Sequence, residues 1–265
     1  YMKLYNDSIY KPLIDKSVLN MHPPGSPFKI LVGLAALQEK SINTKTTIFC
    51  NNEYIYGRNN RKMQCHCGGG YRNLKNAISL SCNSYFANAY RKTIDIEIPI
   101  KESFNIWSDH MKSFGLGNFL NNDLSVGKKG VIPDYDYYEK WYPDFRWGAT
   151  TTLSNSIGQG EVLVTPIQLA NMIAAVANKG FYYTPHIIKK IEGLNIDNKF
   201  KTKNYTTIDS IHYEPMIEGL HEVYNSGTAK FLKVPGIEIC GKTGTAENFT
   251  KINGAVSYTH LTLPT

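Results

Sequence analysis

The sequence predicts a mixed α/β fold of the α+β kind, in which several helices and at least one strand share a domain. Two observations favour helices: apolar residues recur at helical spacing from Ile30 to Leu37 and again from Thr165 to Lys179. A third favours a strand, because Ile237 to Lys242 alternates in character after the turn-forming pair Pro235-Gly236. With 265 residues, 42% of them hydrophobic, the chain can bury a core around these elements.

The first half of the chain predicts two helices. The first should follow Pro23-Pro24-Gly25, since Pro27 is tolerated in a first helical turn. Residues 50–72 are rich in Asn, Gly and Cys and predict a loop. Leu74 to Tyr90 predicts the second helix, whereas residues 93–150 are aromatic and irregular and predict no defined element.

The second half predicts two more helices before the strand. Pro166 and Gly180 mark the two ends of the helix from Thr165 to Lys179. Tyr213 to Asn225 predicts the last helix. No internal repeat and no linker divides the chain, so we expect these elements to pack together.

Charge and hydropathy exclude some partners. The net charge is +7, but the basic residues are scattered or merely paired, as in Lys128-Lys129, so we expect no nucleic-acid partner. No apolar run approaches the ~18 residues that a membrane-spanning helix needs. Because the chain begins at Tyr1 and not at an initiator Met, we expect it to be a piece of a longer protein.

Ser26 and Lys29 lie three residues apart at the start of the first predicted helix. This spacing places both side chains on one helical face, where the positive end of the helix favours a developing anion. A partly desolvated lysine can lose its charge and accept a hydroxyl proton, which would make Ser26 a nucleophile and Lys29 its base. Because S-x-x-K is common by chance, it indicates an acyl-transfer site only together with other motifs.

Two further motifs carry groups that such a site uses. Ser81-Cys82-Asn83 offers a hydroxyl that can relay a proton and an amide that can hold a substrate carbonyl. Lys242-Thr243-Gly244-Thr245 lies at the end of the predicted strand, whose edge can pair with an extended peptide. Lys242 can hold a carboxylate there, and Gly244 lets the backbone approach closely.

The order S-x-x-K, S-x-N, K-T-G resembles that of the penicillin-binding proteins and the class A β-lactamases. Ser156-Ile157-Gly158-Gln159-Gly160, followed by Val164 to Ala170, is similar to the elongation-type class B members, the penicillin-binding protein 2 group. Ser226-Gly227-Thr228-Ala229 also resembles the family. The resemblance runs over residues 10–254. It implies a serine transpeptidase or β-lactamase-like fold: an antiparallel sheet flanked by helices, with an all-helical subdomain, of which this chain holds an incomplete part.

The resemblance also implies a function. The protein would be a serine-type peptidoglycan D,D-transpeptidase that cross-links stem peptides in cell-wall elongation and is a target of β-lactam antibiotics. Ser26 would attack the penultimate D-Ala carbonyl, Lys29 would accept the serine proton, and no cofactor would be required for this chemistry. Ser81 would relay a proton to the leaving D-Ala, and Asn83 would hold the substrate backbone. The substrate-binding residues would be Lys242, Thr243, Gly244 and Thr245, with the N–H groups of Ser26 and Thr245 as the oxyanion hole.

Other functions stay open on the sequence alone. A β-lactamase or a D,D-carboxypeptidase of the same superfamily would carry the same motifs. A lactamase of class A would need a deacylating glutamate after its second motif, for which the sequence offers no convincing candidate. A non-catalytic β-lactam sensor is the alternative outside enzymes, and the three intact motifs argue against a dead scaffold.

Four of the five cysteines, Cys50, Cys65, Cys67 and Cys82, surround the predicted loop. Three interpretations are open: separate buried thiols, disulfides, or the ligands of a structural zinc ion. Four soft ligands around a Gly-rich loop suit tetrahedral zinc, and some members of the resembled group carry zinc between the first two motifs. His66 would be an alternative ligand to Cys65 or Cys67, and we expect the fifth cysteine, Cys240, to be a core thiol.

The resemblance has consequences for both ends of the chain. Upstream it implies an anchor helix in the bacterial inner membrane and a pedestal domain, with the catalytic domain in the periplasm and a glycosyltransferase as partner in the elongation complex. Residues 1–255 would form a partial transpeptidase domain. Residues 256–265 do not continue the family pattern and resemble a translated sequencing adapter, so we expect a non-native tail there.

Overall fold

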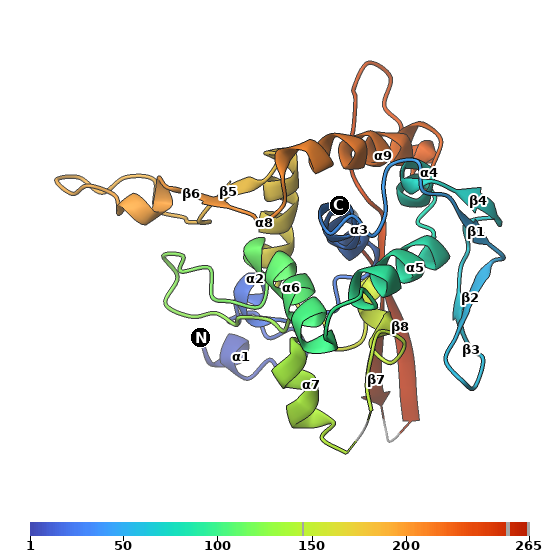
Figure 1. Ribbon diagram of the computed structural model, residues 1–265. Coiled ribbons are helices and arrows are strands. Elements are labelled where there is room, and N and C mark those ends of the chain that lie inside the picture. Colours follow the sequence, from blue (N-terminus) through green and yellow to red (C-terminus); the bar gives the residue numbers. More distant parts are fainter. Residues whose placement is uncertain (145, 253–254, 264–265) are drawn as a thin grey trace.

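Helix α3 (Lys29–Gln38) runs through the centre of the computed structural model, with the other long helices around it (Figure 1). The structure describes residues 1–144, 146–252 and 255–263. Every residue of α3 from Lys29 to Leu37 is buried. This segment is apolar on all sides except at Lys29, and a helix of that kind belongs inside a core. Helices α4, α5, α6 and α9 all contact it.

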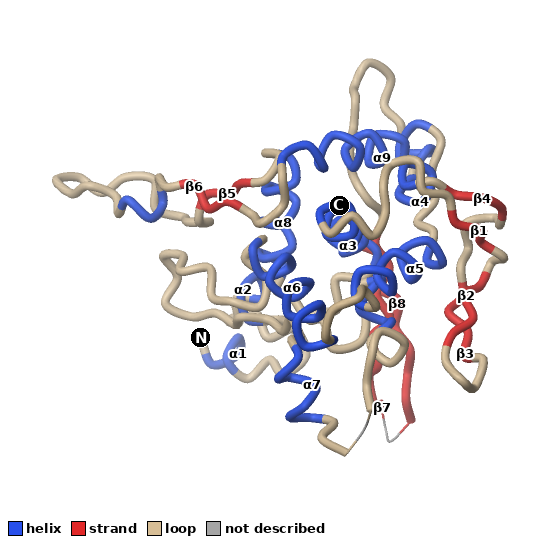
Figure 2. The backbone as a smooth tube through the Cα atoms, viewed as in Figure 1, coloured by secondary structure: helices blue, strands red, loops and turns tan. Residues whose placement is uncertain are grey.

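Helices make up more of the regular secondary structure than strands do (Figure 2). They are α1 (Met2–Tyr5), α2 (Lys16–Leu19), α3, α4 (Leu74–Ser79), α5 (Asn83–Ile94), α6 (Ile100–Ser113), α7 (Tyr135–Trp141), α8 (Pro166–Ala177) and α9 (Tyr213–Asn225). Short 3₁₀ turns add η1 (Ser26–Phe28), η2 (Leu153–Ile157), η3 (Asn198–Phe200), η4 (Ser210–His212) and η5 (Lys230–Leu232). Among the described residues, no helix is both long and apolar enough to cross a membrane.

The strands form separate two-stranded antiparallel pairs (Figure 2). The pairs are β1 (Ile48–Cys50) with β4 (Gly70–Arg72), β2 (Glu53–Tyr56) with β3 (Arg61–Gln64), β5 (Phe181–Tyr183) with β6 (Lys203–Tyr205), and β7 (Gly244–Ile252) with β8 (Ala255–Leu263). Antiparallel strands flanked by helices confirm the predicted fold class.

Three of the predicted helices are confirmed: α3, α8 and α9 occupy the segments that the apolar spacing indicated. The predicted helix from Leu74 to Tyr90 is wrong as one element, because the chain breaks between α4 and α5 at residues 80–82. The predicted loop at 50–72 holds β2, β3 and β4, together with the last residue of β1. Residues 93–150 contain α6 and α7, although the sequence had suggested no element there.

The predicted strand from Ile237 to Lys242 is also wrong. This segment is irregular, Ile237 is 59% exposed, and the strand begins only at Gly244. A strand needs a neighbour for its backbone donors and acceptors, and β7 acquires one from Gly244 onward, where it pairs with Leu263 and the rest of β8. The K-T-G motif therefore leads into a strand and does not end one.

Aromatic residues of α6 pack against Phe28, which lies within the first motif. Trp107 is fully buried and packs edge-on against Phe28, with ring centroids 6.3 Å apart, and against Tyr90, at 5.4 Å. Phe104 lies at 5.4 Å from the same ring. Because Phe28 stands between Ser26 and Lys29, this packing fixes the turn on which both residues lie.

The division between residues 255 and 256 stays a prediction. Residues 255–263 form β8, which pairs with β7 from Ile252↔Ala255 to Gly244↔Leu263. The last two residues of the predicted tail, Pro264 and Thr265, lie outside the described residues.

Candidate active site

Ser26 and Lys29 stand on a turn that glycine makes possible. Gly25 has a φ of 63°, a left-handed conformation that glycine adopts without strain, and it precedes η1, which Ser26 opens. Lys29 then opens α3. Ser26 is half-buried, whereas Lys29 is fully buried.

Gly158 packs against the turn that carries Ser26. The Gly25 N–H donates to the Gly158 carbonyl at 2.9 Å. Gly158 has a φ of 68°, and a Cβ there would overlap the Gly25 carbonyl oxygen and lie 2.6 Å from Phe28 Cβ. The segment Ser156–Gly160 therefore needs a glycine at its centre to pack against the turn that carries Ser26.

Ser81 occupies the break between α4 and α5. Its N–H donates to the Ile78 carbonyl at 3.2 Å, and the Cys82 N–H donates to the Ala77 carbonyl at 2.9 Å. These two bonds close α4 by the Schellman pattern, whose left-handed position is usually glycine. Ser81 holds that position with a φ of 55°, so the second motif includes a non-glycine residue in a strained backbone conformation.

The first two motifs meet in one hydrogen-bond network. Lys29 Nζ donates to the Ser81 carbonyl at 2.8 Å, to Ser81 Oγ at 3.1 Å, and to Asn83 Oδ1. Ser81 Oγ in turn donates to Ser26 Oγ at 3.2 Å. The Ser81 hydroxyl thus lies between the Ser26 hydroxyl and the Lys29 amine, in position to pass a proton between them.

The orientation of the Asn83 amide follows from its other contacts. Asn83 Nδ2 donates to the Gln64 carbonyl at 2.7 Å, so Oδ1 is the atom that faces Lys29. The Asn83 N–H donates to Cys65 Sγ at 3.1 Å, which places β3 and the residue after it against the start of α5.

Burial lowers the pKa of Lys29 from 10.5 to about 8. Desolvation of the ammonium group is the largest cause, and the nearby Cys65 and Cys82 partly oppose it. A lysine with this pKa is neutral in a useful fraction of molecules near pH 7 to 8, which a general base requires.

The third motif lies against the first. Strand β7, which starts at Gly244, contacts η1, in which Ser26 lies. Lys242 is fully buried, and Nζ donates to the Thr243 carbonyl at 3.1 Å and to Thr243 Oγ1 at 3.4 Å. Desolvation, with a contribution from the charge of Lys29, holds the pKa of Lys242 well below its usual value. Thr243 is half-buried and Thr245 is exposed.

The four clustered cysteines come together in one buried group. The Sγ atoms of Cys50, Cys65, Cys67 and Cys82 all lie within 4.8 Å of one another. Cys50 and Cys67 approach to 3.3 Å, Cys65 and Cys67 to 3.5 Å, and Cys65 and Cys82 to 3.6 Å. All four are free thiols.

The cluster joins segments that the sequence keeps apart. Cys50 ends β1, Cys65 and Cys67 follow β3, and Cys82 precedes α5. The hydrogen bond between the Cys65 and Cys82 thiols lowers the pKa of Cys65 and raises that of Cys82. One of the two sulfurs is thereby favoured as a thiolate, the form that binds metals.

The exposure of His66 and of Cys240 bears on two further predictions. His66 is exposed and lies outside the group of four, so the structure does not support it as a replacement for Cys65 or Cys67. The prediction that Cys240 is a core thiol is wrong, because Cys240 is exposed in the irregular segment before β7.

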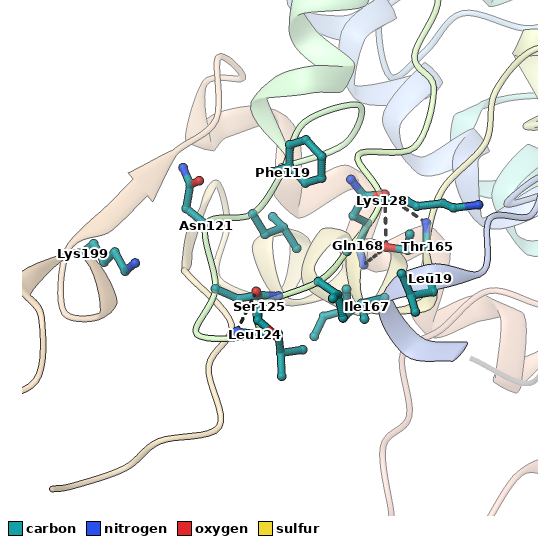
Figure 3. Close-up of a pocket in the computed structure, with 15 residues that line it drawn as sticks. Leu19, Phe119, Asn121, Leu124, Ser125, Lys128, Thr165, Ile167, Gln168 and Lys199 are labelled. Atoms are coloured by element: carbon teal, nitrogen blue, oxygen red, sulfur yellow. Dashed lines mark hydrogen bonds between the residues drawn. The ribbon is translucent and has the colours of Figure 1, made fainter. Parts of the chain in front are cut away.

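A cavity of about 750 Å³ lies elsewhere, between the loop at 119–128 and the start of α8 (Figure 3). Thr165, Gln168 and Lys199 are among the residues that line it. Gln168 is structural: its Nε2 donates to the carbonyls of Gly115, Asn118 and Lys129. The lining contains no carboxylate, histidine or cysteine and none of the three motifs, so we do not assign catalysis to this cavity.

Comparisons with known proteins agree with the motifs. Residues 2–262 match the family described as penicillin binding protein transpeptidase domain. The chain is 30% identical over 248 residues to the peptidoglycan D,D-transpeptidase MrdA of Acinetobacter baumannii, which covers 91% of this chain and 35% of that protein. The chain therefore spans about a third of the length of this curated relative.

Two solved structures show the same fold. Pseudomonas aeruginosa PBP2 in complex with WCK 5153 has a TM-score of 0.80 at 28% identity, over 93% of this chain and 56% of that one. A peptidoglycan synthase complex that coordinates polymerization and crosslinking includes a chain with a TM-score of 0.78 at 27% identity, over 93% of this chain and 40% of that one. Because the family match covers nearly the whole sequence, the chain belongs to the penicillin-binding protein transpeptidase family.

Proposed function

We propose that this chain carries the catalytic site of a peptidoglycan D,D-transpeptidase that acts through a serine acyl-enzyme in cell-wall elongation. One observation carries the proposal: the Ser81 hydroxyl links Ser26 Oγ to a buried Lys29 amine of lowered pKa. A hydroxyl nucleophile with a desolvated amine within reach is the arrangement that serine acyl transfer needs.

In the proposed reaction Ser26 Oγ attacks the carbonyl carbon of the penultimate D-Ala of a stem peptide. The hydroxyl proton passes to neutral Lys29, with Ser81 Oγ between the two groups. The peptide bond breaks, the departing D-Ala amine takes up a proton through Ser81, and an ester to Ser26 remains. The amine of a second stem peptide then attacks this ester and forms the cross-link, and Ser26 regains its proton.

The substrate would be held from two sides. Asn83, whose amide is oriented by Gln64, would contact the peptide backbone. Thr243, beside the buried Lys242, would bind the terminal carboxylate, and Thr245 would contribute to the same subsite. The N–H groups of Ser26 and Thr245 would stabilise the oxyanion, and Gly244 would let the substrate backbone approach β7.

Covalent labelling tests the proposal. A fluorescent penicillin should label the protein at Ser26, and Ser26→Ala should abolish the labelling. Lys29→Ala should reduce the acylation rate by a factor of roughly 10² to 10⁴, the usual contribution of a general base. Labelling that persists in Ser26→Ala would show that another residue is the nucleophile.

The rate of release separates the proposal from its alternative. A β-lactamase would hydrolyse the penicilloyl ester quickly, whereas a transpeptidase should hold it for hours. A carboxypeptidase would release D-Ala from a pentapeptide without forming a dimer when an acceptor amine is supplied. Cross-linked product from donor and acceptor stem peptides is therefore the decisive positive result.

We also propose that the four cysteines hold a structural zinc ion. Around a tetrahedral zinc with Zn–S bonds of about 2.3 Å, neighbouring sulfurs lie ~3.8 Å apart. The observed separations begin at 3.3 Å and none exceeds 4.8 Å, so the donor set fits this ion. Zinc would supply a cross-link between β1, the segment after β3 and the start of α5, and it would take no part in acyl transfer, because four protein ligands leave no open position.

Elemental analysis tests the zinc proposal. Protein purified without added metal should contain about one zinc per chain, and Cys67→Ser should lower both this content and the melting temperature. Cys240→Ser is the matched control, because Cys240 is exposed outside the group and its loss should leave zinc unchanged. Four reactive thiols in a metal-free protein, or Cys50 in a disulfide, would contradict the proposal.

The location and partners of the whole protein are part of the same proposal. We propose a periplasmic domain anchored to the inner membrane by an upstream helix, with a glycosyltransferase of the elongation complex as its partner. The likeness to a chain of a synthase complex that couples polymerization and crosslinking supports this partner. Stem peptides and β-lactam antibiotics would be the ligands. Co-purification of a glycan polymerase with the full-length protein would test it.

A further inference from the structure

The segment Ser226–Ala229 wraps the end of α9 and lies against α4. The Gly227 N–H donates to the Glu222 carbonyl at 2.8 Å, and the Ala229 N–H donates to the Val223 carbonyl at 2.9 Å. A Cβ on Gly227 would overlap the Ser79 carbonyl oxygen. The glycine therefore allows this segment to approach the last turn of α4, which leads into the second motif.

Thr228 makes one bond to the end of α4 and another to the third motif. Its N–H donates to the Ser79 carbonyl at 3.0 Å. Ser79 is the last residue of α4, where carbonyl groups lack partners within the helix. The Thr228 hydroxyl lies 2.8 Å from the Thr243 hydroxyl, in the third motif. One residue thus connects the helix end that leads to Ser81 with the group proposed to bind the substrate carboxylate.

The hydrogen-bonding capacity of Thr243 then decides where its proton points. A hydroxyl offers one proton and two acceptor lone pairs. Lys242 Nζ donates to Thr243 Oγ1 at 3.4 Å, which occupies one lone pair. If Thr228 Oγ1 donates as well, both lone pairs are occupied, and the Thr243 proton is left for another acceptor, such as a substrate carboxylate.

We propose that Thr228 is a positioning residue of the carboxylate subsite, because its hydroxyl donates to Thr243 and directs the Thr243 proton to the substrate. This inference rests on the proposed transpeptidase function. Thr228 does not touch the reacting atoms; it acts through Thr243. The hydrogen bond from its N–H to the Ser79 carbonyl holds the segment at a fixed distance from the end of α4, which leads to the second motif.

The test compares Thr228→Val, which keeps the shape but loses the hydroxyl, with Thr228→Ser, which keeps it. The control is Thr93→Val, since the buried Thr93 hydroxyl makes a similar bond, 2.7 Å from Ser41 Oγ, at the far end of α5. Acylation by benzylpenicillin, followed over a range of concentrations, gives the Kd of the initial complex and the acylation rate constant separately.

Thr228→Val should raise Kd about tenfold, because a mispositioned hydroxyl loses part of a hydrogen bond to a charged group. The acylation rate constant should change less than twofold, since Ser26 and Lys29 are untouched. Thr228→Ser should restore Kd, and Thr93→Val should leave it unchanged. With a penicillin whose carboxylate is esterified, the wild-type protein and Thr228→Val should bind equally weakly.

Several results would overturn the inference. An unchanged Kd in Thr228→Val, no recovery in Thr228→Ser, or an equal rise in Thr93→Val would each remove the role of the hydroxyl while the transpeptidase proposal stands. Adding Thr228→Val to Thr243→Val should cost nothing further, and an additive loss would also contradict it. If Thr228→Val does not fold, Thr228→Ala replaces it in the same comparison. A wild-type protein that is never acylated would instead refute the proposed function, and the inference with it.

Discussion

Lys29 is fully buried, and the surrounding groups decide at which pH its amine is neutral, as the proposed role of a base requires. Its pKa is lowered to about 8, mainly because burial penalises the charged form. Below that pH the amine is protonated and cannot accept the Ser26 proton. The acylation rate constant at saturating penicillin should therefore rise about tenfold per pH unit up to about pH 8 and then level off.

The same titration separates Lys29 from Lys242. The pKa of Lys242 is also lowered, so its charge is lost as the pH rises, and carboxylate binding should weaken as that happens. The effect should appear in Kd and not in the rate constant. A rate constant that stays flat from pH 6 to pH 9 would contradict the assignment of Lys29 as the base.

Ser81 has a strained left-handed backbone, and its hydroxyl lies between Ser26 and Lys29. Two substitutions separate the effect of the strain on stability from the effect of the hydroxyl on acylation. At a φ of 55°, glycine removes a strain of roughly 1 to 2 kcal/mol and loses part of that through its more flexible unfolded chain. Ser81→Gly should therefore be more stable than Ser81→Ala by about 1 kcal/mol. Both lack the hydroxyl between Ser26 and Lys29, so both should acylate slowly.

Urea melts and penicillin labelling of the two variants check this. Equal stabilities would show that the left-handed conformation at Ser81 carries no cost. Rapid acylation by either variant would show that the proton does not need the Ser81 hydroxyl.

The sequence could indicate candidate residues because the spacing within each motif is local, but it could not predict the contacts between motifs. The pairing of Ser26 with Lys29 follows from helical spacing, and the structure places both in one network with Ser81. The bond from Asn83 N–H to Cys65, 18 residues away, and that between Thr228 and Thr243, 15 residues apart, exist only in the fold. The sequence singled out the segments of Gly158 and Thr228 without assigning them a role.

At the scale of elements, the successful predictions had strong apolar periodicity and clear ends. Helix α8 begins at Pro166, with a capping box between Thr165 and Gln168. The sequence itself contains the residue types that form both features. Helix α6 was missed although Phe104, Trp107 and Met111 follow helical spacing, because the aromatic residues around it suggested irregularity. The break at Ser81 was missed because it needs a left-handed serine, for which no sequence signal stands out.

The contact between η2 and η1 gives a prediction about packing. Gly158→Ala should be destabilised by strain at its positive φ and by overlap with Gly25 and Phe28. Gly57→Ala is the matched control: its φ is 69°, almost the same, but nothing lies within 4 Å of the added Cβ. It should show the strain alone, roughly 1 kcal/mol.

Thermal melts and penicillin labelling distinguish the two glycines. Gly158→Ala should lose at least 2 kcal/mol more than Gly57→Ala, within the range for overpacked sites. It should also acylate more slowly, because the turn that carries Ser26 must move. Equal losses in the two variants would mean that Gly158 does not hold that turn.

At the scale of the whole molecule, the core surrounds α3 and one arm stands apart from it. Residues 184–202, between β5 and β6, project from the helical body (Figure 1). Residues 186–195 are all exposed, including Leu194 at 67% and Ile191 at 45%. The base of the arm is fixed by Asp123, which accepts hydrogen bonds from the N–H groups of Ile187 and Ile188. The tip therefore contributes little to the packing that positions the active site.

Shortening the arm tests this division. Replacing residues 190–195 by two glycines removes Ile191 and Leu194, which pair across the tip, and leaves the bonds to Asp123 in place. The melting temperature should stay within about 3 °C, since a change of 1 kcal/mol moves a domain of this size by roughly 2 to 4 °C. Acylation at Ser26 should be unchanged. Leu31→Ala, at a fully buried position of α3, is the comparison and should cost about 2 to 5 kcal/mol. A shortened arm that melts as early as Leu31→Ala would show that the tip belongs to the cooperative core.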